Sequence, residues 1–187
     1  MIEGKSLERL ISFTDAIVAV AITLLILPIT DFFGELNATN FTHELQTGRF
    51  GQMMVGFFIS FFTIFSFWNS HRRLLATTEK INKWAAWFNM IWILAIIAIP
   101  ATTDLIVNVS GFVVTFTYGV ILLIGSLSAV MLRHSIHGRL HLSDMVTSNA
   151  LIVCLILCAI WPTLGPNVFF LLLLTPLTKR QLAKAGH

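Results

Sequence analysis

Long apolar runs alternate with short polar segments along the whole chain. A helix that crosses a bilayer needs about 20 mostly apolar residues, and all but the last of these runs approach that length. The pattern therefore predicts an all-α integral membrane protein with six transmembrane helices, at about Leu10–Ile29, Gly51–Trp68, Trp84–Thr103, Gly111–Leu132, Val146–Leu164 and Asn167–Thr178. The sixth run is short for a crossing, so we expect it to be tilted or to begin in the preceding loop.

The composition supports a membrane protein built as a single domain over residues 1–187. The chain is 56% hydrophobic and only 11% charged, with a mean hydropathy of +0.84. A soluble domain has about 25% charged residues, so lipid is expected to cover much of this surface. Cys154 and Cys158 lie one helical turn apart in an apolar run and are expected to be buried, inert thiols. We expect no nucleic-acid partner and no cofactor.

The basic residues predict an orientation. With the N-terminus inside, every one of the 12 Lys and Arg residues except Arg49 falls in an inner segment. Basic residues gather in cytoplasmic segments of membrane proteins, so both termini are expected in the cytoplasm. The outer segments contain the acidic residues Asp31, Glu35, Glu44 and Asp104. An acidic outer face can concentrate cations, although the same residues also serve the ordinary solubility of a loop.

The first predicted helix combines charge with a regular apolar stripe. Its N-terminal part contains Arg9, Phe13, Thr14 and Asp15. An ionisable residue inside a membrane span is costly and usually faces a partner or a water-filled path. At about 100° per residue, Val20, Leu24 and Leu27 share one side of the helix, and Asp15 points to nearly the opposite side. One side should therefore pack within the protein, and the other can meet something else, such as copies of itself.

Candidate partners for Asp15 lie at matching depth on the next two helices. The second helix ends with Trp68 and His71, and the third begins with Trp84, Trp87 and Asn89. Their indole, imidazole and amide groups can donate hydrogen bonds to a carboxylate. These residues would then clamp the first helix in place. The alternative is that the tryptophans only anchor the protein at the head groups.

These residues also resemble a known family. The signature Arg9-x-x-x-Phe13-Thr14-Asp15, followed by Ala16-Ile17 and Thr23-Leu24-Leu25, is similar to that of the transmembrane protein 175 family, with threonine in place of the usual serine. Trp68-x-x-His71 also looks like the family. The resemblance implies a prokaryotic homotetramer that conducts K⁺ through a central pore lined by the first helices.

In that family the narrowest points of the pore are bulky apolar side chains rather than a carbonyl filter. Carried onto this chain, the resemblance implies that Val20, Leu24 and Leu27 form the constriction and that Thr23 can help to coordinate the ion. Valine is smaller than the isoleucine or leucine usual at the first level. Asp31 would attract cations at the outer end. Pro28 either loosens the helix there or marks its end.

Three other interpretations stay open. Asp15 and His71 could relay protons in a proton-conducting channel or a proton-coupled transporter. His134, His137 and His141 could bind a metal, as in membrane oxidases, although a basic loop facing lipid head groups explains them more simply. The apolar stripe could also be ordinary helix packing in a purely structural membrane protein. We predict that the chain is not an enzyme and that its partners are its own copies, lipid and monovalent cations.

Overall fold

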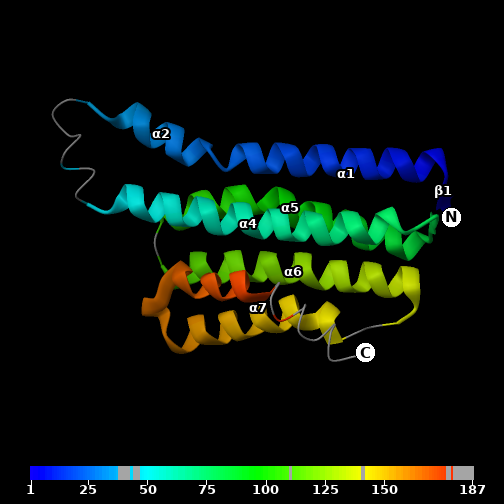
Figure 1. Ribbon diagram of the computed structural model, residues 1–187. Helices are drawn as coiled ribbons and strands as arrows, with labels where there is room; N and C mark the ends of the chain where they lie inside the picture. The colour runs from blue at the N-terminus through cyan, green and yellow to red at the C-terminus, as the bar shows by residue number, and fades with distance from the viewer. Residues whose placement is uncertain (38–42, 44–46, 110, 140–141, 176–177, 179–187) are drawn as a thin grey trace.

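A computed structural model describes residues 1–37, 43, 47–109, 111–139, 142–175 and 178 (Figure 1). This part of the chain is almost entirely helical, as predicted. Its helices are α1 (Lys5–Leu24), α2 (Leu27–Glu35), α4 (Arg49–Ala76), α5 (Lys83–Asn108), α6 (Phe112–His137), α7 (Leu142–Ile160) and the 3-10 helix η1 (Pro162–Leu174). Because α2 continues α1 after a short break, the described residues form six helical rods.

Four segments of the described chain are long and apolar enough to cross a membrane. They are Lys5–Glu35, Arg49–Ala76, Lys83–Ile106 and Phe112–His137. The last two rods are shorter. The fifth was expected to reach Leu164, but α7 ends at Ile160 because the backbone of Trp161 is not helical and a proline comes directly after it. Within η1, Gly165 breaks the helical geometry at φ 54° and ψ −148°.

The rods lie roughly side by side, with α5 in the middle of the bundle (Figure 1). Helix α5 packs against α1, α4 and α6, while α7 and η1 pack against the far side of α6. Gly119 on α6 allows this close approach, because a Cβ atom there would lie 2.7 Å from Leu155 and 2.9 Å from Phe169. Cys154 and Cys158 are buried free thiols in the same core, as predicted.

Polar side chains inside the bundle bond to one another across helices. Ser60 on α4 lies 2.7 Å from the Thr103 hydroxyl of α5 and 3.0 Å from the Tyr118 hydroxyl of α6. Ser126 on α6 and Ser148 on α7 form a similar pair at 2.8 Å. Because buried hydroxyl groups are costly without partners, these contacts fix how the helices pair.

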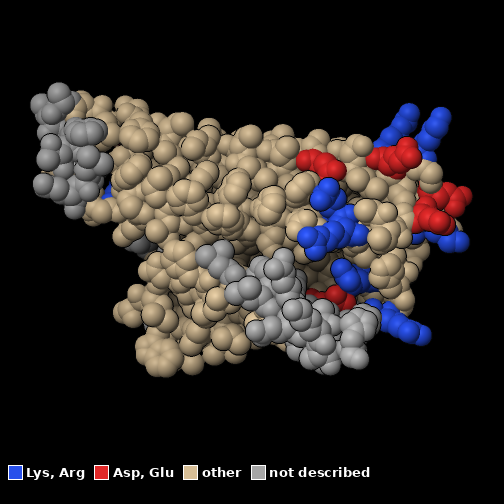
Figure 2. All heavy atoms as spheres, in the orientation of Figure 1, with Lys and Arg blue, Asp and Glu red and all other residues tan. Residues whose placement is uncertain are grey.

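A short β ribbon closes one end of the bundle. Strand β1 (Ile2–Glu3) pairs antiparallel with β2 (Lys80–Ile81), which lies between α4 and α5. The ribbon covers a small core of its own, made of Leu7, Leu74, Ile81, Ala85 and Leu132. Lys and Arg side chains gather at this end, which we call the basic end (Figure 2). The N-terminus therefore lies at the basic end.

Candidate functional site

The apolar stripe of the first helix lies on the surface of the subunit. Val20 is 57% exposed, Leu24 40% and Leu27 49%. Thr23 and Asp31 are exposed as well. Helices α1 and α2 form one edge of the bundle (Figure 1), and only 22% of their most apolar window is buried, compared with 33–50% for the other three long spans. The helix with the least cover inside the subunit thus carries the predicted stripe.

The stripe crosses a break in the helix. Helix α1 ends at Leu24, and the backbone N–H groups of Leu25 and Ile26 donate to the carbonyls three residues back, each at 3.3 Å. Pro28 lies in the first turn of α2 and cannot donate a backbone hydrogen bond. The first helix was expected to end near Ile29, but α2 continues to Glu35. The proline therefore begins a new helix rather than ending the old one.

The hydroxyl groups beside the stripe bond back to their own helix. Thr23 Oγ1 donates to the Val20 carbonyl at 2.7 Å, and Thr30 Oγ1 donates to the Leu27 carbonyl at 2.8 Å. Each hydroxyl uses its single proton in this way, so its oxygen keeps lone pairs that can accept or coordinate. Thr23 thus presents an oxygen with ligand capacity at the level between Val20 and Leu24.

Asp15 lies on the packed side of α1 and contacts α4. Its Oδ1 accepts a hydrogen bond from Trp68 Nε1 at 2.8 Å. The guanidinium of Arg72 lies over the Trp68 ring, 5.0 Å from its centre. The carboxylate is partly buried, and the indole supplies one of the donors that a buried charge requires. This contact holds α1 against α4.

A second set of contacts connects α1 to α5 and α4 one layer further in. Thr14 is buried and donates to the Leu10 carbonyl at 2.8 Å, and Asn89 Nδ2 lies 3.5 Å from its hydroxyl. The Asn89 Oδ1 accepts from His71 Nε2 at 2.7 Å. The His71 ring stacks on Trp92 with their centres 4.0 Å apart. We call the two sets of contacts together the clamp.

The structure brings Thr14, Asp15, Trp68 and His71 together in the clamp, but it leaves Arg9 and Phe13 exposed outside it. Asn89 contacts both Thr14 of α1 and His71 of α4. Its amide, on the buried side of the third helix, was the sequence feature that pointed to this role. Trp92 was not predicted, although it lies three residues after Asn89, a spacing that places two side chains on one helix face. Trp84 and Trp87 are exposed and take no part.

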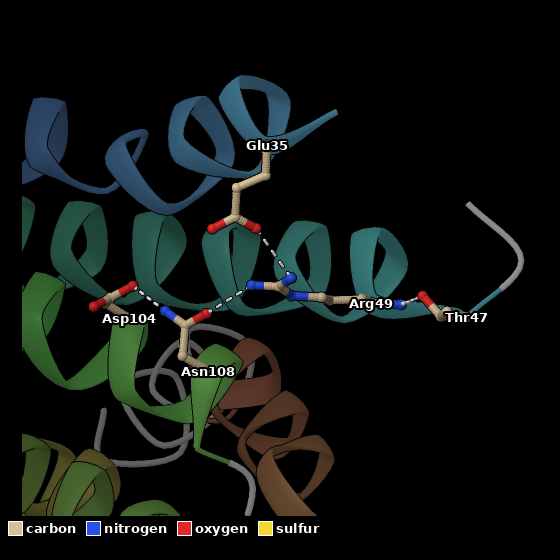
Figure 3. Close-up of polar contacts among 5 residues, drawn as sticks. All are labelled: Glu35, Thr47, Arg49, Asp104 and Asn108. Carbon is tan, nitrogen blue, oxygen red and sulfur yellow. Dashed lines mark hydrogen bonds and ion pairs between the residues drawn. The ribbon is translucent and has the colours of Figure 1, made fainter. Parts of the chain in front are cut away.

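The outer end of α2 is held by Arg49 (Figure 3). Its guanidinium pairs with Glu35 of α2 at 3.3 Å and donates to Asn108 Oδ1 of α5 at 3.2 Å. Asn108 in turn donates to Asp104 at 2.6 Å. Part of the predicted acidic outer face is thus occupied by the lone outer arginine, and Glu44 lies outside the described residues. Sequence reasoning counted Arg49 only as a charge and missed its contacts.

The two described histidines of the metal-binding alternative belong to no group of metal-binding side chains among the described residues. His134 and His137 are exposed, and His141 lies outside the described residues. Within the described part of the chain, no group of three or more His, Cys, Asp or Glu side chains could hold a metal ion.

Comparison with known proteins agrees with the first-helix signature. Residues 9–100 match the family described as endosomal/lysosomal potassium channel TMEM175, and they include the stripe, the clamp and Arg49. The fold is similar to the crystal structure of a lysosomal potassium-selective channel TMEM175 homolog from Chamaesiphon minutus, with a TM-score of 0.77 and 20% identity over 94% of this chain and 99% of that chain. A search of curated proteins gave no match. On the family match and the shared fold, the chain belongs to the TMEM175 family.

Proposed function

We propose that the chain forms a K⁺-permeable cation channel, a homotetramer in which the α1 and α2 segments surround a central pore. The exposed stripe of Val20, Leu24 and Leu27 carries this proposal. A row of apolar side chains that only faces lipid needs no protein partner. Four copies of this stripe around one axis, in contrast, would form successive rings of apolar side chains. Membership of a potassium channel family and the described potassium selectivity of the matched structure support K⁺ as the permeant ion.

The proposed mechanism relies on size and wetting rather than on a carbonyl filter. Rings of Leu24 and Leu27 side chains would exclude water when they lie close to the axis, and an ion cannot cross a dry apolar constriction. A small outward shift would admit water and a hydrated or partly hydrated ion. Thr23 oxygens would help to replace lost water ligands between the first two rings. Asp31 would raise the local cation concentration at the outer entrance.

The break between α1 and α2 suggests how such a constriction could change width. The clamp holds α1 through Thr14 and Asp15, on the N-terminal side of the stripe. Leu27 begins α2, after a turn with long backbone hydrogen bonds. Motion at this turn would displace Leu27 and Asp31 while leaving Val20 in place. The outer ring would then be the mobile gate and the inner ring the fixed one.

The same proposal includes the orientation in the membrane. The basic end carries the N-terminus and nearly all of the Lys and Arg residues that the structure describes, whereas Arg49 lies at the opposite end with Glu35 and Asp104. Cytoplasmic placement of the basic end follows the usual distribution of positive charge. The N-terminus would then be cytoplasmic, an even number of crossings would bring the C-terminus to the same side, and α2 would face the outside or the lumen of a compartment.

Proton conduction through Asp15 and His71 is the alternative, and the geometry supports it less. The two side chains bond to different partners, Asp15 to Trp68 and His71 to Asn89. Asp15 on α1 and His71 on α4 both lie where α1 packs against the rest of the subunit, and not beside the stripe. A proton relay would need a continuous path between them. A channel without such a relay should conduct K⁺ when both groups are intact and the pH is equal on the two sides.

Ion flux into liposomes tests the proposal. We expect purified protein to dissipate a K⁺ gradient at equal pH, and Leu24→Ala to raise the flux several-fold because it widens an apolar ring. Leu94→Ala is the matched control, because Leu94 is 62% exposed but lies on α5. Flux that depends only on a pH gradient and disappears in Asp15→Asn would favour the proton alternative. Equal flux in the two leucine variants would remove the stripe from the pathway.

A further inference from the structure

A cavity near the basic end takes no part in the proposed pore. Its volume is about 270 Å³, and it lies between α4, α6 and α7 with Trp92 of α5 at one wall. Apolar walls come from Phe67, Leu74 and Val130, and hydroxyl groups come from Ser66, Ser70, Ser126 and Thr147. A mixed lining of this kind suits a molecule with one polar and one apolar part.

Two arginines give the cavity a positive charge. Arg73 and Arg133 both line it, together with the single carboxylate of Asp144. Arg133 Nη1 pairs with Asp144 Oδ1 at 3.2 Å, so this pair is neutral and the charge of Arg73 remains. A guanidinium has several N–H donors in one plane and matches the oxygens of a phosphate group. The lining therefore carries more positive than negative charge, which favours an anion.

A buried donor without an acceptor lies in the same wall. Trp92 Nε1 is the one buried side-chain polar atom that has no hydrogen-bond partner within the described residues. A buried N–H without a partner is costly, so native structures usually supply one. Trp92 lines the cavity, but its Nε1 is itself buried, so an oxygen atom held in the cavity would accept this hydrogen bond only after a shift of the indole ring.

We infer that this cavity binds a phosphate group, with Arg73 and Arg133 as the cationic donors and the apolar wall against the group that carries it. The basic end is where the head groups of one leaflet would lie around a spanning bundle. An anionic phospholipid provides both the phosphate and an apolar part, and free phosphate provides only the first. The inference needs the chain to span a membrane, but it does not depend on ion conduction.

Lipid binding by the purified full-length protein tests this inference. Native mass spectrometry in detergent would compare phosphatidylglycerol with phosphatidylcholine, and inorganic phosphate would be added as a competitor. We expect preferential binding of phosphatidylglycerol and about tenfold weaker binding in Arg73→Gln, the loss of one charge-assisted contact. Arg139→Gln is the matched control, because Arg139 is an exposed arginine just beyond α6 that does not line the cavity.

A second variant separates a shaped site from general surface charge. Ser70→Phe keeps the net charge but fills part of the cavity, and it should weaken binding as Arg73→Gln does. Thermal unfolding without lipid verifies that both variants are folded. Competition by millimolar phosphate would identify a soluble anion as the ligand, and its absence would identify the lipid. Equal losses in Arg73→Gln and Arg139→Gln, or full binding by folded Ser70→Phe, would overturn the inference.

Discussion

At the residue scale, one charged hydrogen bond connects the proposed pore helix to its neighbour. Asp15 and Trp68 lie 53 residues apart in the chain, and their 2.8 Å contact joins α1 to α4. Both side chains are partly buried, so water competes for the bond less than at an open surface. A hydrogen bond to a charged group contributes about 1.5–3 kcal/mol to stability. The contact is therefore large enough to influence assembly.

We expect Asp15→Ala to destabilise the protein by about 1–2 kcal/mol, because it removes the acceptor of the Trp68 indole. Asp15→Asn should cost less, since an amide oxygen can still accept the bond. Thermal unfolding in detergent and the elution volume of the oligomer measure the two effects. The double variant Asp15→Ala with Trp68→Phe is the control for a direct contact. Its loss of stability should be smaller than the sum of the losses in the two single variants. Additive losses would show that Asp15 acts through some other group.

Residue spacing alone predicted the stripe but not the clamp in full. Helical periodicity puts Val20, Leu24 and Leu27 on one side whatever surrounds them, so their shared face can be read from the sequence. The contact of Asp15 with Trp68 was one of several that matched in depth. Choosing among Trp68, Trp84 and Trp87 requires the rotation of each helix about its own axis, which neighbouring helices decide. Only the structure shows that Trp84 and Trp87 point outward.

At the scale of elements, α2 is held mainly by apolar packing and only secondarily by Arg49. Phe32 is buried to 1% exposure and packs with Ile29 and Met53. Burying such a side chain contributes about 1.5–3 kcal/mol. The pair of Arg49 and Glu35 is well exposed, and such pairs contribute about 0–1 kcal/mol. The hydrophobic contact should therefore decide whether α2 stays docked on α4.

Hydrogen exchange of the α2 amides tests this order of importance. We expect Phe32→Ala to raise the hydrogen-exchange rates of the Leu27–Glu35 amides strongly. In this variant, local opening of α2 would no longer carry the cost of exposing a large apolar ring to water. Arg49→Gln should raise it by no more than about fivefold, which corresponds to about 1 kcal/mol. Amides in the middle of α6 serve as the internal control in both variants. If Arg49→Gln had the larger effect, the polar network would be the main tether and α2 would respond to ionic strength.

The break between α1 and α2 shows the limit of prediction for elements. The run from Ala16 to Ile29 is apolar throughout apart from Thr23, and Pro28 fits equally well with a helix end or a helix start. The choice depends on the residues after Pro28, because Phe32 and Glu35 find partners on α4 only if the chain remains helical beyond the break. Contacts between distant parts of the sequence therefore decide this boundary.

At the scale of the whole molecule, the subunit leaves its most regular apolar surface without cover. The other long spans bury a third to a half of their apolar windows inside the subunit, but Lys5–Glu35 buries 22%. Lipid can cover such a surface, so exposure alone does not require a partner. The clamp on the opposite side, however, fixes the rotation of α1. A fixed rotation points the stripe in one constant direction, which a symmetric pore needs.

Cysteine crosslinking between subunits tests that arrangement. If four stripes meet at an axis, Leu27→Cys should form covalent dimers rapidly with a short thiol crosslinker, because equivalent residues lie closest there. Leu94→Cys on α5 is the matched control, since it is at least as exposed but should face lipid. The native Cys154 and Cys158 are buried and should react slowly. Crosslinking through Leu94→Cys and none through Leu27→Cys would place α1 on the outside of the assembly, and the apolar rings could not exist.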